Sequence, residues 1–137
     1  MIKITEDNFS IDQVVNEIKK KNIGAIVSFL GIVRGKTEDR NVEQLEIQTY
    51  KEMAHDQLKK IEKETFEKFN VKEITIIHRI GVLKVTENIL LIVIGSSHRD
   101  DAFKACRFVL EELKKNVPLW KKEYTKTGEV WILGGKK

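Results

Sequence analysis

Cysteine and proline are almost absent from this 137-residue chain, which contains one of each. A lone cysteine, Cys106, excludes an internal disulfide and a structural zinc site built from several cysteines. It also suits a reducing compartment, where disulfides are rare. One proline leaves no Pro-rich linker, and neither an internal repeat nor a low-complexity segment marks a boundary. We therefore expect residues 1–137 to form a single domain.

Common signatures of cofactor binding and catalysis are missing as well. The sequence has no glycine-rich dinucleotide-binding turn, no P-loop, no nucleophile elbow and no pair of histidines at metal-ligand spacing. Its longest apolar run, residues 89–94, is too short to cross a bilayer, and residues 1–10 lack the apolar stretch of a signal peptide. We therefore expect a cytoplasmic protein without a metal or a common cofactor.

Positive charge exceeds negative charge only slightly. Lysine and arginine together number 25, and aspartate and glutamate 21, which gives a formal net charge of +4. This excess suits an acidic protein or a phosphorylated small molecule about as well as it suits nucleic acid. The function therefore depends on where the positive side chains lie in the fold.

Helical and strand periodicities follow one another without a strict βαβ order, which predicts an α+β fold. Strands are expected at residues 2–4, 25–33, 45–50, 71–80, 89–94, 120–124 and 129–133. Helices are expected at residues 11–22, 54–69 and 99–116. The first helix should begin after a Ser10 cap and end near Gly24, which tolerates a left-handed backbone. Residues 35–41 should form a mobile polar loop.

Some side chains are expected in the interior from the same periodicity. The apolar stripe of the second helix includes Phe66, and that of the third includes Phe103 and Cys106. His78 shares a strand face with apolar neighbours, so we expect a half-buried imidazole that forms a hydrogen bond.

The segment from Gly95 to Arg99 leads from an apolar strand through small polar residues into a helix. Backbone amides at the start of that helix, with Arg99 beside them, can hold a phosphate or a carboxylate. Alternatively, Ser97 only caps the helix, and Asp100 and Asp101 complement its dipole and repel anions. From these residues alone, capping is the favoured interpretation.

Two further basic segments carry chemistry that an anionic ligand would need. Arg34 ends an apolar strand, and its forked guanidinium suits phosphate, although a solvated arginine is the simpler interpretation. Lysine pairs at 114–115 and 121–122 flank a proline and a tryptophan. A partly buried lysine can act as acid, base or nucleophile, whereas lysines at a helix end also complement its dipole. Spacing alone does not choose between Lys114 and Lys115.

Taken together, these segments resemble the blocks of one family, the molybdopterin synthase large (catalytic) subunits. The similar blocks are residues 24–34 (GAIVSFLGIVR), 45–46 (LE), 50–53 (YKEM), 78–81 (HRIG), 97–103 (SHRDDAF) and 114–123 (KKNVPLWKKE). The similarity extends from Gly24 to Trp131.

The resemblance implies an α/β-hammerhead-type fold with a mixed or antiparallel sheet, packed helices and a small additional β-subdomain. It implies a homodimer at the centre of a heterotetramer, with a small ubiquitin-like sulfur-carrier subunit at each end. The C-terminal Gly-Gly thiocarboxylate of that subunit would enter a pocket of the large subunit. There it would give sulfur to cyclic pyranopterin monophosphate and form the dithiolene of molybdopterin.

Carried over residue by residue, the resemblance implies that Lys114 is the principal catalytic lysine and that Lys121 assists it. It implies a larger substrate-binding set, to which both protomers of a dimer can contribute: Ile32, Val33, Arg34, His98, Arg99, Lys114, Lys121, Lys122 and Glu123. Both reactants are anions, so we expect these positive side chains to gather in one hollow. The sulfur arrives on the partner, so the reaction implies neither a metal nor a catalytic cysteine.

A non-enzymatic protein that binds nucleic acid is the competing hypothesis. It would use the basic loop at residues 35–41 and the stretch of lysines around Trp120. Aromatic residues make up only 7% of the chain, and no RNA-binding motif is present, so the residues favour this hypothesis less.

Overall fold

The computed structural model describes residues 1–38 and 40–132. Its larger sheet has the strand order β1-β6-β8-β2. These strands are β1 (Ile2–Thr5), β2 (Ala25–Ile32), β6 (Val71–Arg79) and β8 (Asn88–Ser96). β1 runs parallel to β6, whereas β8 is antiparallel to both of its neighbours. The sheet is therefore mixed, as expected for the α+β class.

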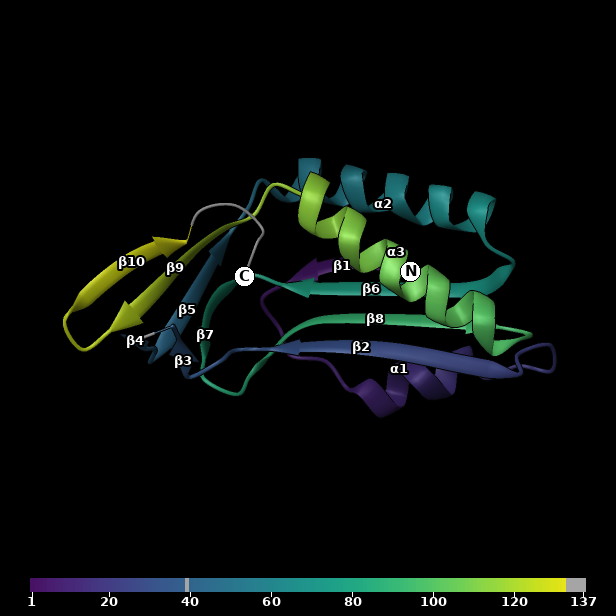
Figure 1. The fold of residues 1–137 in the computed structure, drawn as a ribbon, viewed down its shortest axis with the longest axis horizontal. Coiled ribbons are helices and arrows are strands. Elements are labelled where there is room, and N and C mark those ends of the chain that lie inside the picture. Colours follow the sequence, from purple (N-terminus) through teal and green to yellow (C-terminus); the bar gives the residue numbers. More distant parts are fainter. Residues whose placement is uncertain (39, 133–137) are drawn as a thin grey trace.

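Helices cover both faces of this sheet. They are α1 (Ile11–Ile18), α2 (Lys51–Lys68) and α3 (Arg99–Asn116). α2 and α3 lie on one face and α1 lies on the other (Figure 1). The central strand β8 is apolar from Ile89 to Ile94, because its side chains alternate between two buried faces. Ile92 and Ile94 pack under α2 and α3, and Leu91 and Val93 pack against α1. Within the described residues, no helix is long and apolar enough to span a membrane.

A second, antiparallel sheet lies at one end of the first, beside the C-terminal end of α3 (Figure 1). Its order is β10-β9-β5-β7. These strands are β5 (Gln44–Gln48), β7 (Gly81–Lys84), β9 (Trp120–Thr125) and β10 (Gly128–Ile132). β6 of the large sheet leads into β7 at Gly81, whose φ of +93° favours glycine. This sheet is the small additional β-subdomain that the resemblance implied.

Residues 35–41 are not the irregular loop that we expected. Lys36–Thr37 (β3) pairs with Arg40–Asn41 (β4) in a short antiparallel hairpin. The Thr37 side chain is buried. Two-residue polar strands carry no hydrophobic alternation, so the sequence pattern could not reveal them.

The first helix begins as expected but ends earlier. The backbone N–H of Gln13 donates to Oγ of the Ser10 cap at 3.2 Å. The helix ends at Ile18, and Gly24 does not have the positive φ that we expected. Gly24 is required for another reason, because a Cβ there would lie 2.4 Å from the backbone oxygen of Ser97. The start of β2 and the approach to α3 therefore touch backbone to backbone.

Two aromatic side chains that we expected in the core lie at the surface. Phe66 is 44% exposed and Phe103 is 62% exposed. The buried stripe of α2 runs through Ile61 and Thr65, and the Thr65 hydroxyl donates to the carbonyl of Ile61. Phe66 is therefore one position beyond the buried face. Cys106 is buried in α3, as expected.

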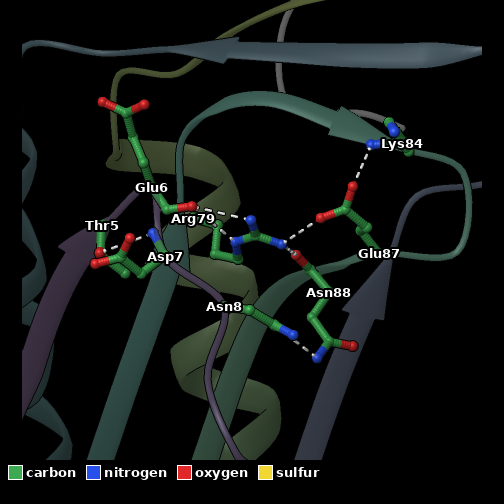
Figure 2. A network of polar contacts seen from close by, with 8 residues as sticks. All are labelled: Thr5, Glu6, Asp7, Asn8, Arg79, Lys84, Glu87 and Asn88. Atoms are coloured by element: carbon green, nitrogen blue, oxygen red, sulfur yellow. Dashed lines mark hydrogen bonds and ion pairs between the residues drawn. The ribbon is translucent and has the colours of Figure 1, made fainter.

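A buried guanidinium joins three parts of the chain near the end of β6 (Figure 2). Arg79 is 6% exposed and donates to the carbonyl of Glu6 from Nη2 at 2.9 Å and to that of Asn88 from Nη1 at 3.2 Å. Its Nη1 also pairs with the carboxylate of Glu87 at 3.0 Å, which in turn accepts the backbone N–H of Lys84. A buried charge needs such partners, so Arg79 fixes the segment after β1 to the β7–β8 turn.

His78, the residue before Arg79, is a second buried polar group of β6. It is 3% exposed, more buried than the half-buried position that we expected, and it forms the expected hydrogen bond. Nδ1 lies 2.8 Å from the carbonyl oxygen of Arg79. Burial lowers the pKa of His78 from 6.5 to about 4; the hydrogen bond to Arg79 opposes this shift, and the charge of Lys121 adds to it. The imidazole is therefore neutral at neutral pH.

Gly24→Ala tests the backbone contact between Gly24, which precedes β2, and Ser97, which precedes α3. We expect it to lower the free energy of unfolding by about 1–3 kcal/mol, because its Cβ has no room beside Ser97. Gly31→Ala is the matched control, since the nearest atom would be 3.5 Å from its Cβ. It should change the free energy by less than about 1 kcal/mol. Urea denaturation measures both variants, and equal stability would contradict the contact.

Because of His78, the free energy of unfolding should fall as the pH falls. Its pKa is 6.5 in the unfolded chain and about 4 in the folded one, so the unfolded state binds the proton first as the pH falls. Stability should decrease between pH 6.5 and 4, by about 1.4 kcal/mol per pH unit from this group, or roughly 2 kcal/mol at pH 5. His78→Asn should lack this decrease. Urea denaturation at pH 7 and pH 5 measures it, and an identical decrease in both proteins would refute the assignment.

Candidate functional site

A cavity of about 630 Å³ lies at the C-terminal end of α3, between β2 and the small sheet. Its apolar wall is formed by Phe29, Leu90, Leu113, Val117 and Leu119. Its polar side chains come from segments far apart in the sequence: Arg34, Thr37, His78, Lys114, Lys115, Lys121 and Glu123. The elements that carry them meet where the helical layer adjoins the small sheet (Figure 1).

The end of α3 places two of the predicted catalytic residues in this cavity. The helix ends where the N–H of Val117 donates to the carbonyl of Leu113 at 3.1 Å, and Pro118 cannot continue it. The chain then turns directly into β9. Lys114 in the last helical turn and Lys121 at the start of β9 therefore line the same cavity.

Three positive charges converge here. Burial lowers the pKa of Lys121, and the neighbouring charges of Lys114 and Arg34 lower it further. The amine of Lys121 therefore gives up its proton more readily than a solvated lysine does. Arg34 and Lys114, which we expected to share one hollow, both line the cavity, while their chemical roles stay predictions.

The surroundings of Lys114 and Lys115 differ, although spacing in the sequence could not separate them. Lys115 pairs with Glu112 at 3.6 Å, and its side chain is 73% exposed. No described carboxylate forms an ion pair with Lys114, whose charge acts on Lys121 instead. Of these two neighbours, Lys114 is thus the one without an ion pair among the described residues.

Glu123 is a buried carboxylate whose two oxygens already have partners. Oε2 accepts the hydroxyl of Thr37 at 2.8 Å, and Oε1 accepts Nη2 and Nε of Arg40 at 2.9 and 3.2 Å. Glu123 therefore ties β9 to the β3–β4 hairpin and forms part of the cavity wall. Our reading of the sequence missed Thr37 and Arg40, because both fell in the segment expected to be a loop.

Lys122 points away from the cavity. Alternation along β9 sends Lys121 and Glu123 to one side and Lys122 to the other. Its Nζ lies 3.1 Å from the carboxylate of Glu129, 3.9 Å from that of Glu46 and 4.8 Å from the ring centroid of Trp131. The structure thus does not bring this predicted substrate ligand to the other ones within one protomer.

His98 and Arg99 also lie outside the cavity. They stand at the start of α3, and Arg99 is 15 residues from Lys114, which is roughly 22 Å along the helix axis. Figure 1 shows the two ends of α3 at opposite ends of the large sheet. Our capping interpretation was wrong, because the Ser97 hydroxyl donates to the carbonyl of Asn22 at 3.1 Å, and the His98 side chain makes no capping bond to a described residue.

The two apolar members of the predicted substrate-binding set do line the cavity. Ile32 is 47% exposed and Val33 is 2% exposed, as alternation at the end of β2 requires. In the part of the chain that the structure describes, no group of three or more histidine, cysteine, aspartate or glutamate side chains could hold a metal ion.

Comparisons with known protein families, sequences and structures all match the same family. The family model described as MoaE protein matches residues 4–116. The molybdopterin synthase catalytic subunit of Pyrococcus abyssi is 41% identical over 134 residues, which cover 98% of this chain and 90% of that one. The crystal structure of molybdopterin synthase from Staphylococcus aureus aligns with a TM-score of 0.89 at 35% identity, over 94% of each chain.

A more distant structure shares the fold. It is the complex of subunits 1 and 2 of molybdopterin-converting factor from Helicobacter pylori, 21% identical, with a TM-score of 0.79 over 96% of this chain and 90% of that one. The family model spans well over half of the chain, and the Pyrococcus relative matches nearly all of it. The chain therefore belongs to the MoaE family, the catalytic subunits of molybdopterin synthase.

Proposed function

We propose that this protein transfers sulfur from the C-terminal thiocarboxylate of a small ubiquitin-like subunit to cyclic pyranopterin monophosphate, and so forms the dithiolene of molybdopterin. The observation that carries the proposal is the convergence of Arg34, Lys114 and Lys121 in one cavity with an apolar wall. The phosphate and the thiocarboxylate are both anions, and positive side chains fixed around them would hold both and stabilise the charge that develops during transfer.

The two lysines have different tasks in this proposal. Lys114, whose charge has no described carboxylate partner, is the principal catalytic group and faces the developing negative charge. Lys121 has a lowered pKa because it is buried beside two positive charges, which suits a group that accepts and returns a proton. An arriving anion offsets those charges, so substrate binding itself would favour the protonated form of Lys121.

A second copy of the chain would supply the residues that this protomer holds far from its cavity. His98 and Arg99 stand at the other end of α3 from Lys114. We place them in the cavity of the other protomer of a homodimer, with a small subunit bound at each end of the resulting heterotetramer. The complex of subunits 1 and 2 from Helicobacter pylori supports the pairing of a large with a small subunit. The buried, unpaired Cys106 suits the cytoplasm as the place of the reaction.

Glu123 and Lys122 complete the site indirectly. Glu123 is bonded to Arg40 and Thr37, so we assign it the task of holding the β3–β4 hairpin against β9. Lys122 is paired with Glu129 on the outer side of the same strand. The alternative of a nucleic-acid-binding protein is less favoured, because Arg40 and Lys122, one residue from each basic segment that it would use, already have intramolecular carboxylate partners.

Lys114→Ala tests the catalytic assignment. It should lower product formation at least about 100-fold, because the loss of a charge that stabilises the transition state costs roughly that much. Lys115→Ala is the matched control and should stay within about 3-fold of the wild type, since exposed ion pairs such as the one with Glu112 contribute little. Mass analysis after mixing with thiocarboxylated small subunit and precursor measures the product. Co-purification with the small subunit checks assembly, and normal turnover by Lys114→Ala would refute the assignment.

Mixing variants tests whether two protomers share a site. Lys114→Ala and Arg99→Ala should each be inactive as homodimers. In a mixed dimer, one of the two sites would keep both native residues, so random pairing of equal amounts should restore about a quarter of the wild-type activity. Co-expression with two affinity tags isolates the mixed dimer, which alone should have about half of the wild-type activity. If each site instead used residues of a single protomer, no activity would return.

A further inference from the structure

His78 occupies a polar position in the otherwise apolar wall of the cavity. It lies on β6 and shares the cavity with Leu90, Leu113 and Val117. Its side chain is 3% exposed. None of the tasks assigned above to the lysines, Arg34 or Glu123 involves this imidazole, so its presence in the wall needs a separate account.

The hydrogen bond to Arg79 determines which ring nitrogen carries the proton. A carbonyl oxygen only accepts, so Nδ1, at 2.8 Å from it, must donate its hydrogen. In the neutral ring, Nε2 is then a bare acceptor. The ring is neutral at neutral pH, because burial lowers the pKa of His78 to about 4.

The other ring nitrogen, Nε2, is not hydrogen-bonded within the described part of the chain. Within the described residues, no side-chain nitrogen or oxygen is both fully enclosed and without a partner. The unbonded Nε2 is therefore not fully enclosed, and the cavity is the space that His78 lines.

The other polar side chains of the cavity differ from His78. Arg34 and Lys114 only donate hydrogen bonds, and Lys121 accepts one only when its amine has lost its proton. The hydroxyl of Thr37 already donates to Glu123. The carboxylate of Glu123 is occupied by Thr37 and Arg40. A ligand with N–H groups therefore finds a neutral nitrogen acceptor at His78, in the same cavity as the donors that would hold an anion.

We propose that Nε2 of His78 accepts a hydrogen bond from an N–H group of the pterin ring and so determines how the substrate is oriented in the cavity. This inference rests on the proposed function. The positive side chains hold the phosphate, the apolar wall packs against the ring, and His78 selects a ring that presents a donor at its edge. His78 is thus a specificity-determining residue that contacts the substrate without taking its proton.

Two substitutions separate the ring nitrogens. His78→Asn retains a donor near the Nδ1 position and removes the acceptor at Nε2, whereas His78→Gln places an amide oxygen near the Nε2 position. His78→Asn should weaken the binding of cyclic pyranopterin monophosphate roughly 10-fold, as expected when a buried donor loses its partner. His78→Gln should stay within about 3-fold of the wild type, because an acceptor remains. Titration calorimetry measures both, and equal affinities for His78→Asn and the wild type would overturn the proposal.

A second titration identifies the source of the N–H group. The small subunit also brings N–H groups, on its C-terminal peptide, so its binding is measured with the same variants. Unchanged affinity for the small subunit supports the pterin as the donor, and a loss confined to the small subunit overturns it. If the wild type binds no cyclic pyranopterin monophosphate, the proposed function fails, and the role of His78 fails with it. If the wild type binds it and His78→Asn binds it equally well, only the role of His78 fails.

Nitrogen-15 NMR of the wild-type protein provides a test that does not depend on how a variant folds. The Nε2 resonance of His78 should have the shift of an unprotonated ring nitrogen and should move upfield when the pterin is added, because the nitrogen then accepts a hydrogen bond. A protonated Nε2 before addition, or an Nε2 shift that the pterin leaves unchanged, would overturn the proposal.

Discussion

Repulsion among Arg34, Lys114 and Lys121 is the constraint on which the site depends. Burial of Lys121 beside two positive charges is unfavourable until an anion arrives, as its lowered pKa records. The fold must therefore hold three mutually repelling groups in place. Each of the three residues belongs to, or directly follows, an element of the fold. Arg34 follows the end of β2, Lys114 lies in the last turn of α3, and Lys121 lies at the start of β9.

The surrounding polar contacts are consistent with that requirement. Glu123 carries the negative charge nearest in sequence to Lys121, but Arg40 pairs with it, so Glu123 is not available to neutralise the positive charges of the cavity. Arg79 is buried with carbonyl and carboxylate partners and fixes the end of β6 from which His78 projects. Among the described residues, the buried charges of Arg79 and Glu123 thus have their own partners, whereas no described carboxylate forms an ion pair with Arg34, Lys114 or Lys121.

Elements with long uninterrupted patterns could be predicted from the sequence, and contacts between distant segments could not. The bounds of α3 and the buried apolar β8 follow directly from periodicity. The requirement for Gly24 comes from a backbone oxygen 73 positions away, at Ser97, so no local signal contains it. Alternation along β9 could have shown that Lys122 faces away from Lys121. That Nε2 of His78 is a free acceptor depends on a carbonyl position, which only coordinates reveal.

The alternation of β9 has a consequence for how this part of the chain can change. One face of the strand carries Lys121 and Glu123 and the other carries Lys122 above Trp131. Insertion or deletion of a single residue between Pro118 and Lys121 would invert the strand, moving the Lys122 cation inward and the Lys121 amine into solvent. A change of one residue is therefore excluded from the connection that leaves α3, and a change of two residues is the smallest that keeps Lys121 on the cavity side.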